Sequence, residues 1–262
     1  EGGNALNTKY EIRKKYENDA VRYDFFLSPS FYATTCFRSA FNLDSFPNVK
    51  IVEKGYPRND SLFTYQEKEK DKIKEYLHLP KEKKIILYAP TWRDNLHAAG
   101  VGYVQEMMID FSYLEEQLKE EYIILFRSHY FIANNLDLKK YEGFLYDVSQ
   151  YEEVNDLYYI SDLLITDYSS VFFDYANLLK PMIFYMYDYD QYKNQLRDFY
   201  IDLEELPGVI IKSKNEKKLC NVIKNISSYQ KRYQLKYQKF HQKFNYLDGK
   251  DITIKIVMLK DL

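Results

Sequence analysis

Two serines and an aspartate in one short stretch have the types and spacing to bind a phosphate and neighbouring hydroxyls. In "LLITDYSSVFFDYANLLKPMIFY", residues 163–185, an apolar run ends in Asp-Tyr-Ser-Ser and an amphipathic segment follows at once. Ser169 and Ser170 stand where that segment becomes helical, so backbone N–H groups, the helix dipole and two hydroxyls would face an anion. Asp174 lies one turn further along and could accept hydrogen bonds from ligand hydroxyls. The alternative is that Ser169 only caps the helix and Asp174 interacts with its dipole.

A second group of polar side chains follows the apolar run "YIILF". Arg127, Ser128 and His129 come directly after it. Arg127 can form two parallel hydrogen bonds with a phosphate, and His129 can neutralise a phosphate oxygen or transfer a proton near neutral pH. A purely structural role for His129 is the alternative.

Two further loops carry candidate ligand-binding residues. After "ILYA", Pro90 ends a strand and fixes a turn, Thr91 offers a hydroxyl, and Trp92 either packs on the sheet or stacks on a base. Arg58 in "GYPRND" is another candidate phosphate ligand, and the alternative is an ion pair with Asp60.

The remaining polar residues do not form a known cofactor or metal motif. No HExxH, paired Cys/His spacing, glycine-rich phosphate loop or GxGxxG fingerprint occurs. The alternating carboxylates of "YDYDQY", residues 187–192, are a weak candidate for a cation site. We therefore expect no metal and no cofactor.

The elements that position these loops alternate regularly between strand and helix. Short, continuously apolar strands separated by helices predict a parallel sheet covered on both faces. Ligands of such sheets bind beyond the carboxyl ends of the strands. The predicted strands, each followed by a loop or helix, lie near 23–29, 84–90, 144–149, 182–186 and 209–211. Three more segments each combine a strand with the turn or loop after it: 49–60, 122–130 and 163–170. A charged helix over 61–82 would cross from one unit to the next.

Composition indicates a soluble globular protein large enough for one or two hydrophobic cores. The chain has 262 residues, of which 46% are hydrophobic and 29% charged, and it contains no internal repeat and no transmembrane run. It begins with Glu rather than Met, so we expect a piece of something longer. Two cysteines without a CxxC motif fit a reducing, cytoplasmic setting.

Charge is unevenly distributed along the chain. The net charge is −2, but residues 212–250 hold ten Lys and one Arg against Glu216 and Asp248, a local balance of +9. Such a block suggests a surface for anionic lipid or an anionic polymer. The alternative is an ordinary solvated helix face.

Taken together, the motifs "GYPRND", "ILYAPTWRDN", "RSHY" and "LLITDYSSVFFDYANLLKPMIFY" resemble those of the CDP-glycerol glycerophosphotransferase family. These enzymes build the glycerol-phosphate or ribitol-phosphate chains of wall teichoic acids and some capsules. The resemblance runs from about residue 20 to "FNYLDGK" near residue 250, and the four motifs occur in the family's order.

The resemblance implies a GT-B architecture with two Rossmann-like domains. Residues 1–60 would be the end of the N-terminal, acceptor-side domain. Residues 61–262 would be the C-terminal domain that binds the CDP-polyol, with the last helix returning to the first domain. Ser169 and Ser170 would hold phosphate at the helix start, and Asp174 would bind donor hydroxyls. The residues implied to line the pyrophosphate are Arg58, Pro90, Thr91, Arg127, Ser128 and His129, of which His129 is also the catalytic candidate.

One departure from the family pattern bears on activity. The family carries a His-Gly-Thr-Pro motif whose histidine is thought to be the general base, and this sequence has no such motif. We therefore expect donor binding by this chain and poor turnover by this piece alone.

The implied reaction transfers glycerol phosphate or ribitol phosphate from CDP to a terminal hydroxyl of a lipid-linked acceptor, releasing CMP. Arg58, Arg127, His129 and the helix dipole would offset the developing negative charge. The acceptor would place the protein peripherally on the cytoplasmic face of the membrane, where the basic block would contact anionic lipid.

Two other functions fit the same sequence features. A GT-B glycosyltransferase that uses a nucleotide sugar would share the sheet, the phosphate-binding helix start and the ribose carboxylate. A non-catalytic module could retain the fold without activity. Nucleic acid is not an expected partner, because the basic block lacks a recognisable DNA- or RNA-binding motif.

Overall fold

The computed structural model describes residues 9–91, 97–98, 102–104, 109–128, 132–133, 138–191 and 201–261. The chain forms two compact units. The first comprises Glu1–Thr64, Asp190–Leu206 and Leu235–Leu262, and the second comprises Tyr65–Tyr189 and Pro207–Gln234.

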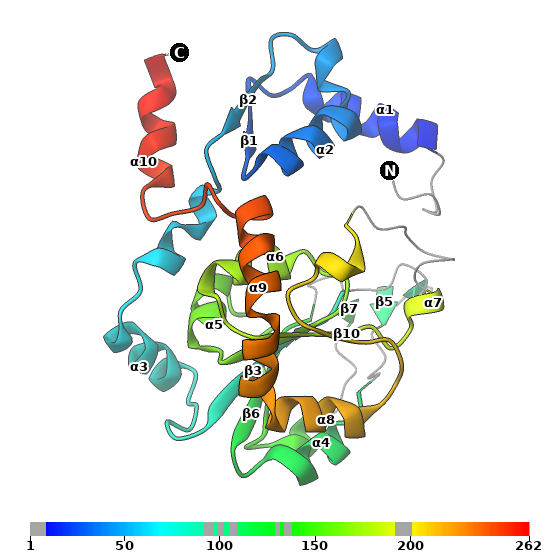
Figure 1. The fold of residues 1–262 in the computed structure, drawn as a ribbon, viewed down its shortest axis with the longest axis vertical. Helices are drawn as coiled ribbons and strands as arrows, with labels where there is room; N and C mark the ends of the chain where they lie inside the picture. Colours follow the sequence, from blue (N-terminus) through cyan, green and yellow to red (C-terminus); the bar gives the residue numbers. More distant parts are fainter. Residues whose placement is uncertain are drawn as a thin grey trace. The chain divides into compact units, whose positions relative to one another are not determined.

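The second unit is built on a six-stranded parallel sheet (Figure 1). The strand order is β11-β10-β9-β3-β6-β8, and every neighbouring pair is parallel. The strands are β3 (Lys84–Ala89), β6 (Tyr122–Phe126), β8 (Leu145–Asp147), β9 (Leu163–Thr166), β10 (Met182–Tyr185) and β11 (Val209–Ile211). A separate small sheet contains β4 (His97–Ala98), β5 (Gly102–Val104) and β7 (Ile132–Ala133).

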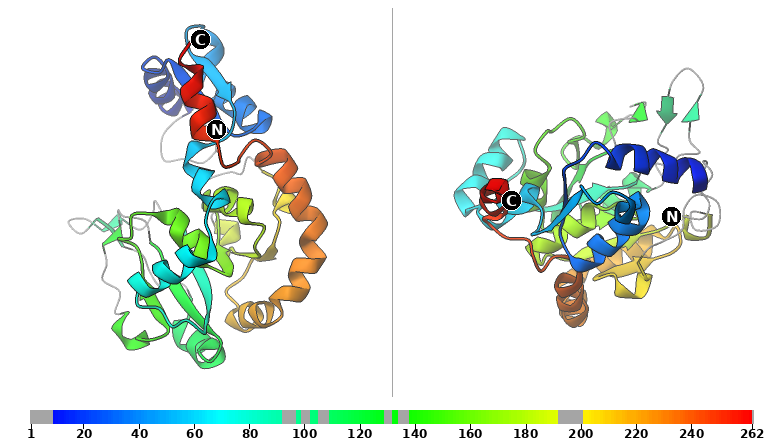
Figure 2. Two further views of the ribbon diagram at one scale, coloured as in Figure 1. Left: turned by 90° about the vertical axis from the view of Figure 1, so that its left-hand side faces the viewer. Right: turned by 90° about the horizontal axis from the view of Figure 1, so that it is seen from above.

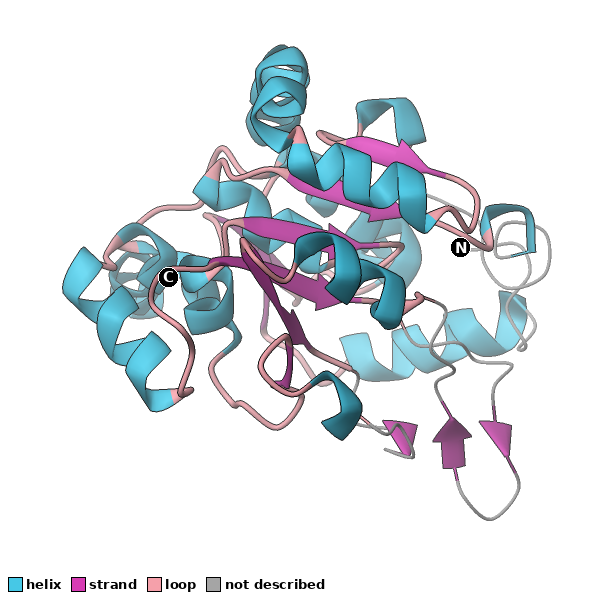
Figure 3. Cartoon of the chain, turned by 90° about the horizontal axis from the view of Figure 1, so that it is seen from below, coloured by secondary structure: helices cyan, strands magenta, loops and turns pink. Residues whose placement is uncertain are grey.

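Helices cover both faces of the large sheet (Figure 3). Because neither face meets water, the strands are apolar at successive positions, and Ile85, Ile86 and Leu87 are all fully buried. Each such side chain contributes about 1.5–3 kcal/mol of hydrophobic stabilisation. The helices that belong wholly to this unit are α3 (Glu67–Tyr76), α4 (Phe111–Leu118), α5 (Val154–Ile160), α6 (Val171–Tyr175) and α8 (Glu216–Lys224). Helix α3 packs beside α5, and α4 packs beside α8 (Figure 1).

Two predicted helices are shorter in the structure. The charged helix expected over 61–82 is confined to α3, which begins at the capping box formed by Gln66 and Glu69 and ends before His78, whose φ is +53°. The helix predicted to begin at Ser169–Ser170 is only five residues long, because α6 passes into the 3-10 turn Ala176–Leu178.

The first unit contains a two-stranded parallel sheet with helices beside it (Figure 2). Strand β1 (Phe25–Ser28) pairs with β2 (Lys50–Glu53), and helix α2 (Phe31–Phe41) packs against both strands and against α1 (Lys9–Ala20). The aromatic rings of Tyr16, Phe26, Phe37 and Phe41 fill the space between these elements.

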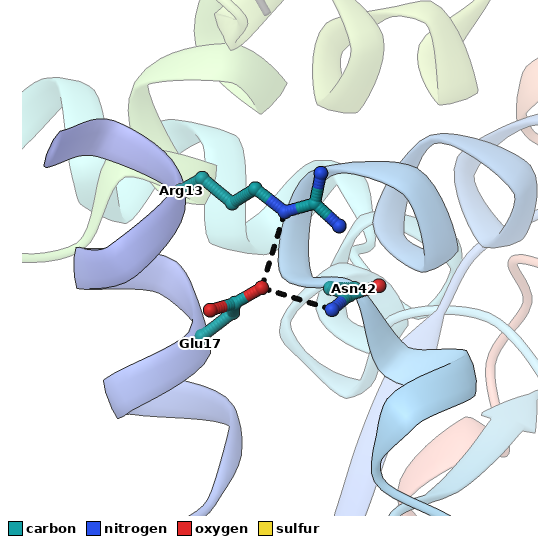
Figure 4. Close-up of polar contacts among 3 residues, drawn as sticks. All are labelled: Arg13, Glu17 and Asn42. Carbon is teal, nitrogen blue, oxygen red and sulfur yellow. Dashed lines mark hydrogen bonds and ion pairs between the residues drawn. The ribbon is translucent and has the colours of Figure 1, made fainter. Parts of the chain in front are cut away.

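A carboxylate ties α1 to the end of α2. Glu17 Oε1 accepts hydrogen bonds from Arg13 Nε at 3.1 Å and from Asn42 Nδ2 at 2.9 Å (Figure 4). Asn42 ends α2 in the left-handed conformation, with φ +51°. Asparagine tolerates that conformation and still offers a side-chain donor, which explains its place at this junction.

The end of the chain also belongs to the first unit. Helix α9 (Ile226–Phe244) passes from the second unit into the first at Leu235, and α10 (Ile252–Val257) follows. Asp248 accepts hydrogen bonds from the backbone N–H of Tyr56 at 2.9 Å and from Asn59 Nδ2 at 2.8 Å.

The compact units therefore differ from the predicted division into residues 1–60 and 61–262. The first unit extends to Thr64, and it includes the C-terminal segment from Leu235. The family resemblance already implied that the last helix returns to the first domain, and Asp248 contributes hydrogen bonds to Tyr56 and Asn59 within that unit. The α/β class with parallel strands and helices on both sheet faces is confirmed.

Candidate functional site

The order of the strands places the topological switch point of the sheet, where a ligand crevice is expected, between β3 and β9. The chain proceeds from β3 to β6 and β8 on one side, then returns to β9 next to β3 and continues to β10 and β11 on the other. Loops that leave the carboxyl ends of β3 and β9 therefore diverge toward opposite sides, and open α/β sheets bind ligands at that point. The motifs that end these strands supply the candidate side chains.

A buried aspartate joins these two loops. Asp167, which is 2% exposed, accepts three hydrogen bonds on Oδ1: from the backbone N–H of Thr91 at 2.7 Å, from Thr91 Oγ1 at 2.6 Å and from the backbone N–H of Tyr168 at 2.6 Å. Thr166 Oγ1 also donates to the backbone carbonyl of Ala89 at 2.7 Å. The loop that contains Thr91 is thus fixed against the start of the Ser169–Ser170 turn.

Sequence reasoning gave Asp167 no role. It is the first residue after a four-residue apolar strand, and a buried charged side chain at that place is unusual unless hydrogen bonds compensate it. The missing information was the partner, because Thr91 is 76 residues away in the sequence.

The two serines do not act as a simple side-chain cap of helix α6. Ser170, not Ser169, occupies the N-cap position of α6; it has φ −64° and ψ −5°, and its side chain forms no capping hydrogen bond. Ser170 is exposed and Ser169 is half-buried. The exposed hydroxyl of Ser170 is therefore not committed to the helix end. Asp174 lies in the first turn of α6 and is half-buried.

The strand-end residues after β6 hold the neighbouring loop. Arg127 Nη1 donates to the backbone carbonyls of Val148 at 3.0 Å and Tyr151 at 2.6 Å. Burial lowers the pKa of Arg127, because the charged guanidinium loses hydration. These bonds show Arg127 positioning the segment after β8, and its predicted contact with pyrophosphate stays a prediction.

Ser128 belongs to a chain of short polar contacts. Its backbone N–H donates to Ser149 Oγ at 2.9 Å, its own Oγ lies 3.0 Å from Ser149 Oγ, and Ser149 Oγ donates to Asp147 Oδ1 at 2.6 Å. The side chain of Ser128 is buried. Hydrogen bonds of polar side chains thus join the loops after β6 and β8, as they also join the loops after β3 and β9.

The other predicted site residues have different positions. Pro90 is buried at the end of β3. Arg58 belongs to the first unit, where its guanidinium lies 4.1 Å from the centre of the Tyr56 ring. His129, the catalytic candidate, and Trp92 lie outside the described residues.

The described part of the chain provides no obvious metal site or membrane span. No group of three or more His, Cys, Asp or Glu residues is arranged there to hold a metal ion. No helix among the described residues has the length and hydropathy needed to cross a membrane.

A family profile identifies the class of protein. The profile of the family described as CDP-glycerol:poly(glycerophosphate) glycerophosphotransferase matches residues 2–259, and the chain belongs to this family.

Relatives and a solved structure agree with this assignment. The chain is 45% identical over 224 residues to the teichoic acid poly(glycerol phosphate) polymerase of Bacillus subtilis (strain 168). The aligned region covers 85% of this chain and 29% of that protein. It is 42% identical over 170 residues to the teichoic acid poly(ribitol-phosphate) polymerase of Bacillus spizizenii (strain ATCC 23059 / NRRL B-14472 / W23), covering 63% of this chain and 27% of that protein. The structure of the wall teichoic acid polymerase TagF superimposes with a TM-score of 0.86 and 40% identity, covering 97% of this chain and 61% of that one.

The likeness to TagF supports the predicted GT-B-type fold. The chain spans less than a third of the length of these two relatives and about three fifths of the TagF chain.

Proposed function

We propose that this chain carries the donor-binding part of an enzyme that transfers glycerol phosphate or ribitol phosphate from a CDP-polyol to a lipid-linked teichoic acid or capsule acceptor, with release of CMP. The observation that carries the proposal is the junction of the Thr91 loop and the Ser169–Ser170 turn by Asp167 at the β3–β9 crevice. Membership of the family supplies the substrate class.

In this proposal, the residues around the crevice divide the work of binding the donor. Ser169 and Ser170 donate hydrogen bonds to the pyrophosphate, and Asp174 accepts hydrogen bonds from donor hydroxyls. Thr91 fixes the neighbouring loop, because its single hydroxyl proton is already donated to Asp167. Asp167 positions the donors without contacting phosphate, since its Oδ1 already accepts three hydrogen bonds.

The proposed chemical step is attack by an acceptor hydroxyl oxygen on the phosphorus that carries the polyol. A new P–O bond forms, the P–O bond to CMP breaks, and the hydroxyl proton passes to a base. CMP leaves with additional negative charge, which Arg127 and His129 would offset.

The proposed lipid-linked acceptor determines where in the cell the protein would act. We place the protein peripherally at the cytoplasmic face of the membrane, with the basic block 212–250 toward anionic lipid. Lys214, Lys217 and Lys218 of that block are exposed. The block is not uniformly available, however, because Lys243 forms an ion pair with Glu205 at 2.5 Å. If vesicles with anionic lipid bind the protein no better than neutral vesicles do, the membrane contact is wrong.

The test of donor binding is calorimetric titration with CDP-glycerol, CDP, CMP and UDP-glucose. We expect CDP-glycerol or CDP to bind preferentially, and Ser170→Ala to weaken that binding about tenfold, the value of one lost hydrogen bond to a charged group. Ser227→Ala, which removes an exposed serine hydroxyl in the first turn of α9, is the matched control.

Preferential binding of UDP-glucose would favour transfer of a sugar instead. Equal affinities of the Ser170→Ala and Ser227→Ala variants for CDP would remove the serine turn from the donor site. Unchanged CMP release from CDP-glycerol by His129→Ala, in the presence of acceptor, would remove His129 from the chemistry.

A further inference from the structure

A second group of polar side chains lies at the carboxyl ends of β1 and β2, within the first unit. Ser28 and Glu53 are the last residues of these strands and are paired across the parallel ladder. Helix α2 begins just beyond β1, capped by Ser30, whose Oγ accepts a hydrogen bond from the backbone N–H of Ala33 at 3.2 Å. This is the edge at which parallel strands present ligand-binding groups.

Two neutral hydroxyl groups hold the Glu53 carboxylate. Thr34 Oγ1 donates to Glu53 Oε2 at 2.5 Å, and the hydroxyl of Tyr246 donates to Glu53 Oε1 at 3.2 Å. Tyr246 is itself fixed, because its hydroxyl accepts a hydrogen bond from the backbone N–H of Phe31 at 3.2 Å. Ser28 Oγ lies 2.8 Å from Thr34 Oγ1 and completes the group.

The carboxylate keeps capacity for a ligand. Within the described part of the chain, Glu53 forms no ion pair. Each carboxylate oxygen can accept more than one hydrogen bond, so one further acceptor position on each oxygen is open to other donors.

Water and ligands can reach Glu53 and Tyr246, whereas Ser28 and Thr34 are buried. Glu53 is half-exposed, and Tyr246, whose hydroxyl contacts it, is 45% exposed. An exposed aromatic ring next to a fixed carboxylate offers an apolar face for C–H groups and an acceptor for hydroxyl groups.

The charge of this group selects the kind of ligand. An anion such as a phosphodiester in direct contact would be repelled by Glu53. A divalent cation would need several more oxygen ligands than this single carboxylate and its hydroxyl neighbours provide. A neutral compound with vicinal hydroxyl groups satisfies both the carboxylate and the exposed ring of Tyr246.

We propose that Glu53 and Tyr246, held in place by Ser28, Thr34 and the backbone N–H of Phe31, form a binding subsite for a neutral polyol end. This inference rests on the proposed function, in which that end is the terminal unphosphorylated unit of the acceptor. Glu53 accepts hydrogen bonds from its hydroxyl groups, and the phosphodiester part of the acceptor lies away from the carboxylate. The subsite thus distinguishes a free polyol end from one that already carries a phosphate.

Fluorescence anisotropy with two synthetic probes tests the subsite. Both are short oligo(glycerol phosphate) chains with a fluorophore at one end; the other end is a free diol in one probe and a phosphate monoester in the second. The intact chain, Glu53→Gln and the control Glu204→Gln are compared. Glu204 is an exposed carboxylate of the same unit, so the control makes the same change of charge.

We expect the wild-type chain to bind the diol-ended probe about tenfold more tightly than the phosphate-ended probe. Glu53→Gln should weaken binding of the diol-ended probe about tenfold, because hydrogen bonds to a charged acceptor become neutral ones. Its affinity for CDP, measured by calorimetry, should be unchanged. Thermal unfolding of both variants serves as a check that they are folded.

Three results would overturn the subsite: equal binding of both probes by the wild-type chain, no binding of the diol-ended probe, or a Glu53→Gln variant that binds like Glu204→Gln. In each of these results the proposed donor function survives if CDP still binds. Loss of CDP binding by the wild-type chain would instead contradict the donor function.

Discussion

Replacing Asp167 by Asn should loosen the junction between the two loops of the candidate donor site. Asn is nearly the same size as Asp and keeps one side-chain oxygen that can accept from Thr91 and Tyr168. What changes is the charge of the acceptor. The three hydrogen bonds at 2.6–2.7 Å would become neutral ones.

The expected magnitude follows from those three bonds. A hydrogen bond to a charged group contributes about 1.5–3 kcal/mol to stability, and a neutral one about 0.5–1.5 kcal/mol. The loss would be about 3 kcal/mol if all three bonds weakened independently. Removing a buried charge recovers part of this loss, so we expect Asp167→Asn to lower the free energy of unfolding by about 1–3 kcal/mol.

A double-mutant cycle with Thr91→Val isolates the contact itself. Thr91→Val removes the hydroxyl that donates to Asp167 at 2.6 Å. Urea unfolding can be followed by far-UV circular dichroism. We expect a coupling energy of about 1–2 kcal/mol between the two substitutions, and a lower affinity for CDP in each variant.

Asp71→Asn is the control, since Asp71 is an exposed carboxylate of the same unit. A coupling energy below about 0.5 kcal/mol would mean that the two side chains act independently. Unchanged CDP affinity in a clearly destabilised Asp167→Asn protein would refute the positioning role while leaving the structural one.

Three further predictions test other parts of the fold. Burial lowers the pKa of Lys180 to about 8, below its value of about 10.4 in an unfolded chain. Between these two pH values the unfolded state therefore holds more protons than the folded state, and the free energy of unfolding should rise with pH. Urea titrations of Lys180→Met at pH 7.5 and 10 should show a smaller rise than those of the wild-type chain. Gly55→Ala should lower the free energy of unfolding by about 2 kcal/mol or more, because φ is +99° and the new Cβ would lie 2.6 Å from the carbonyl oxygen of Leu247. Gly143→Ala, with φ +84° and no atom within 4 Å of the new Cβ, should lower it by about 1 kcal/mol. Equal losses of stability in thermal unfolding would contradict the clash at Gly55. Ser30→Ala removes the hydroxyl that caps α2 and should lower the free energy of unfolding by about 1 kcal/mol, whereas an unchanged urea midpoint would show that the cap is dispensable.

The strands and the loops that follow them could be predicted from the sequence. Runs such as Ile85–Leu87 and Leu163–Ile165 are apolar at every position, which indicates strands buried on both faces, and polar residues directly after such runs indicate the ligand edge of a parallel sheet. This pattern indicates Arg127 and Thr91 as candidate site residues. These inferences need only local patterns, because burial and strand periodicity are written into neighbouring residues.

The hydrogen-bonding partners of those residues required the tertiary structure. Thr91 and Asp167 meet only because β9 inserts beside β3, and Arg127 reaches the carbonyl groups of Val148 and Tyr151 only because β8 lies next to β6. In the same way, Glu53 meets a tyrosine 193 residues further along the chain. A sequence determines which residues are apolar and which are polar, but the order in which strands pair decides which polar groups become neighbours, and that order is set by the packing of the whole sheet.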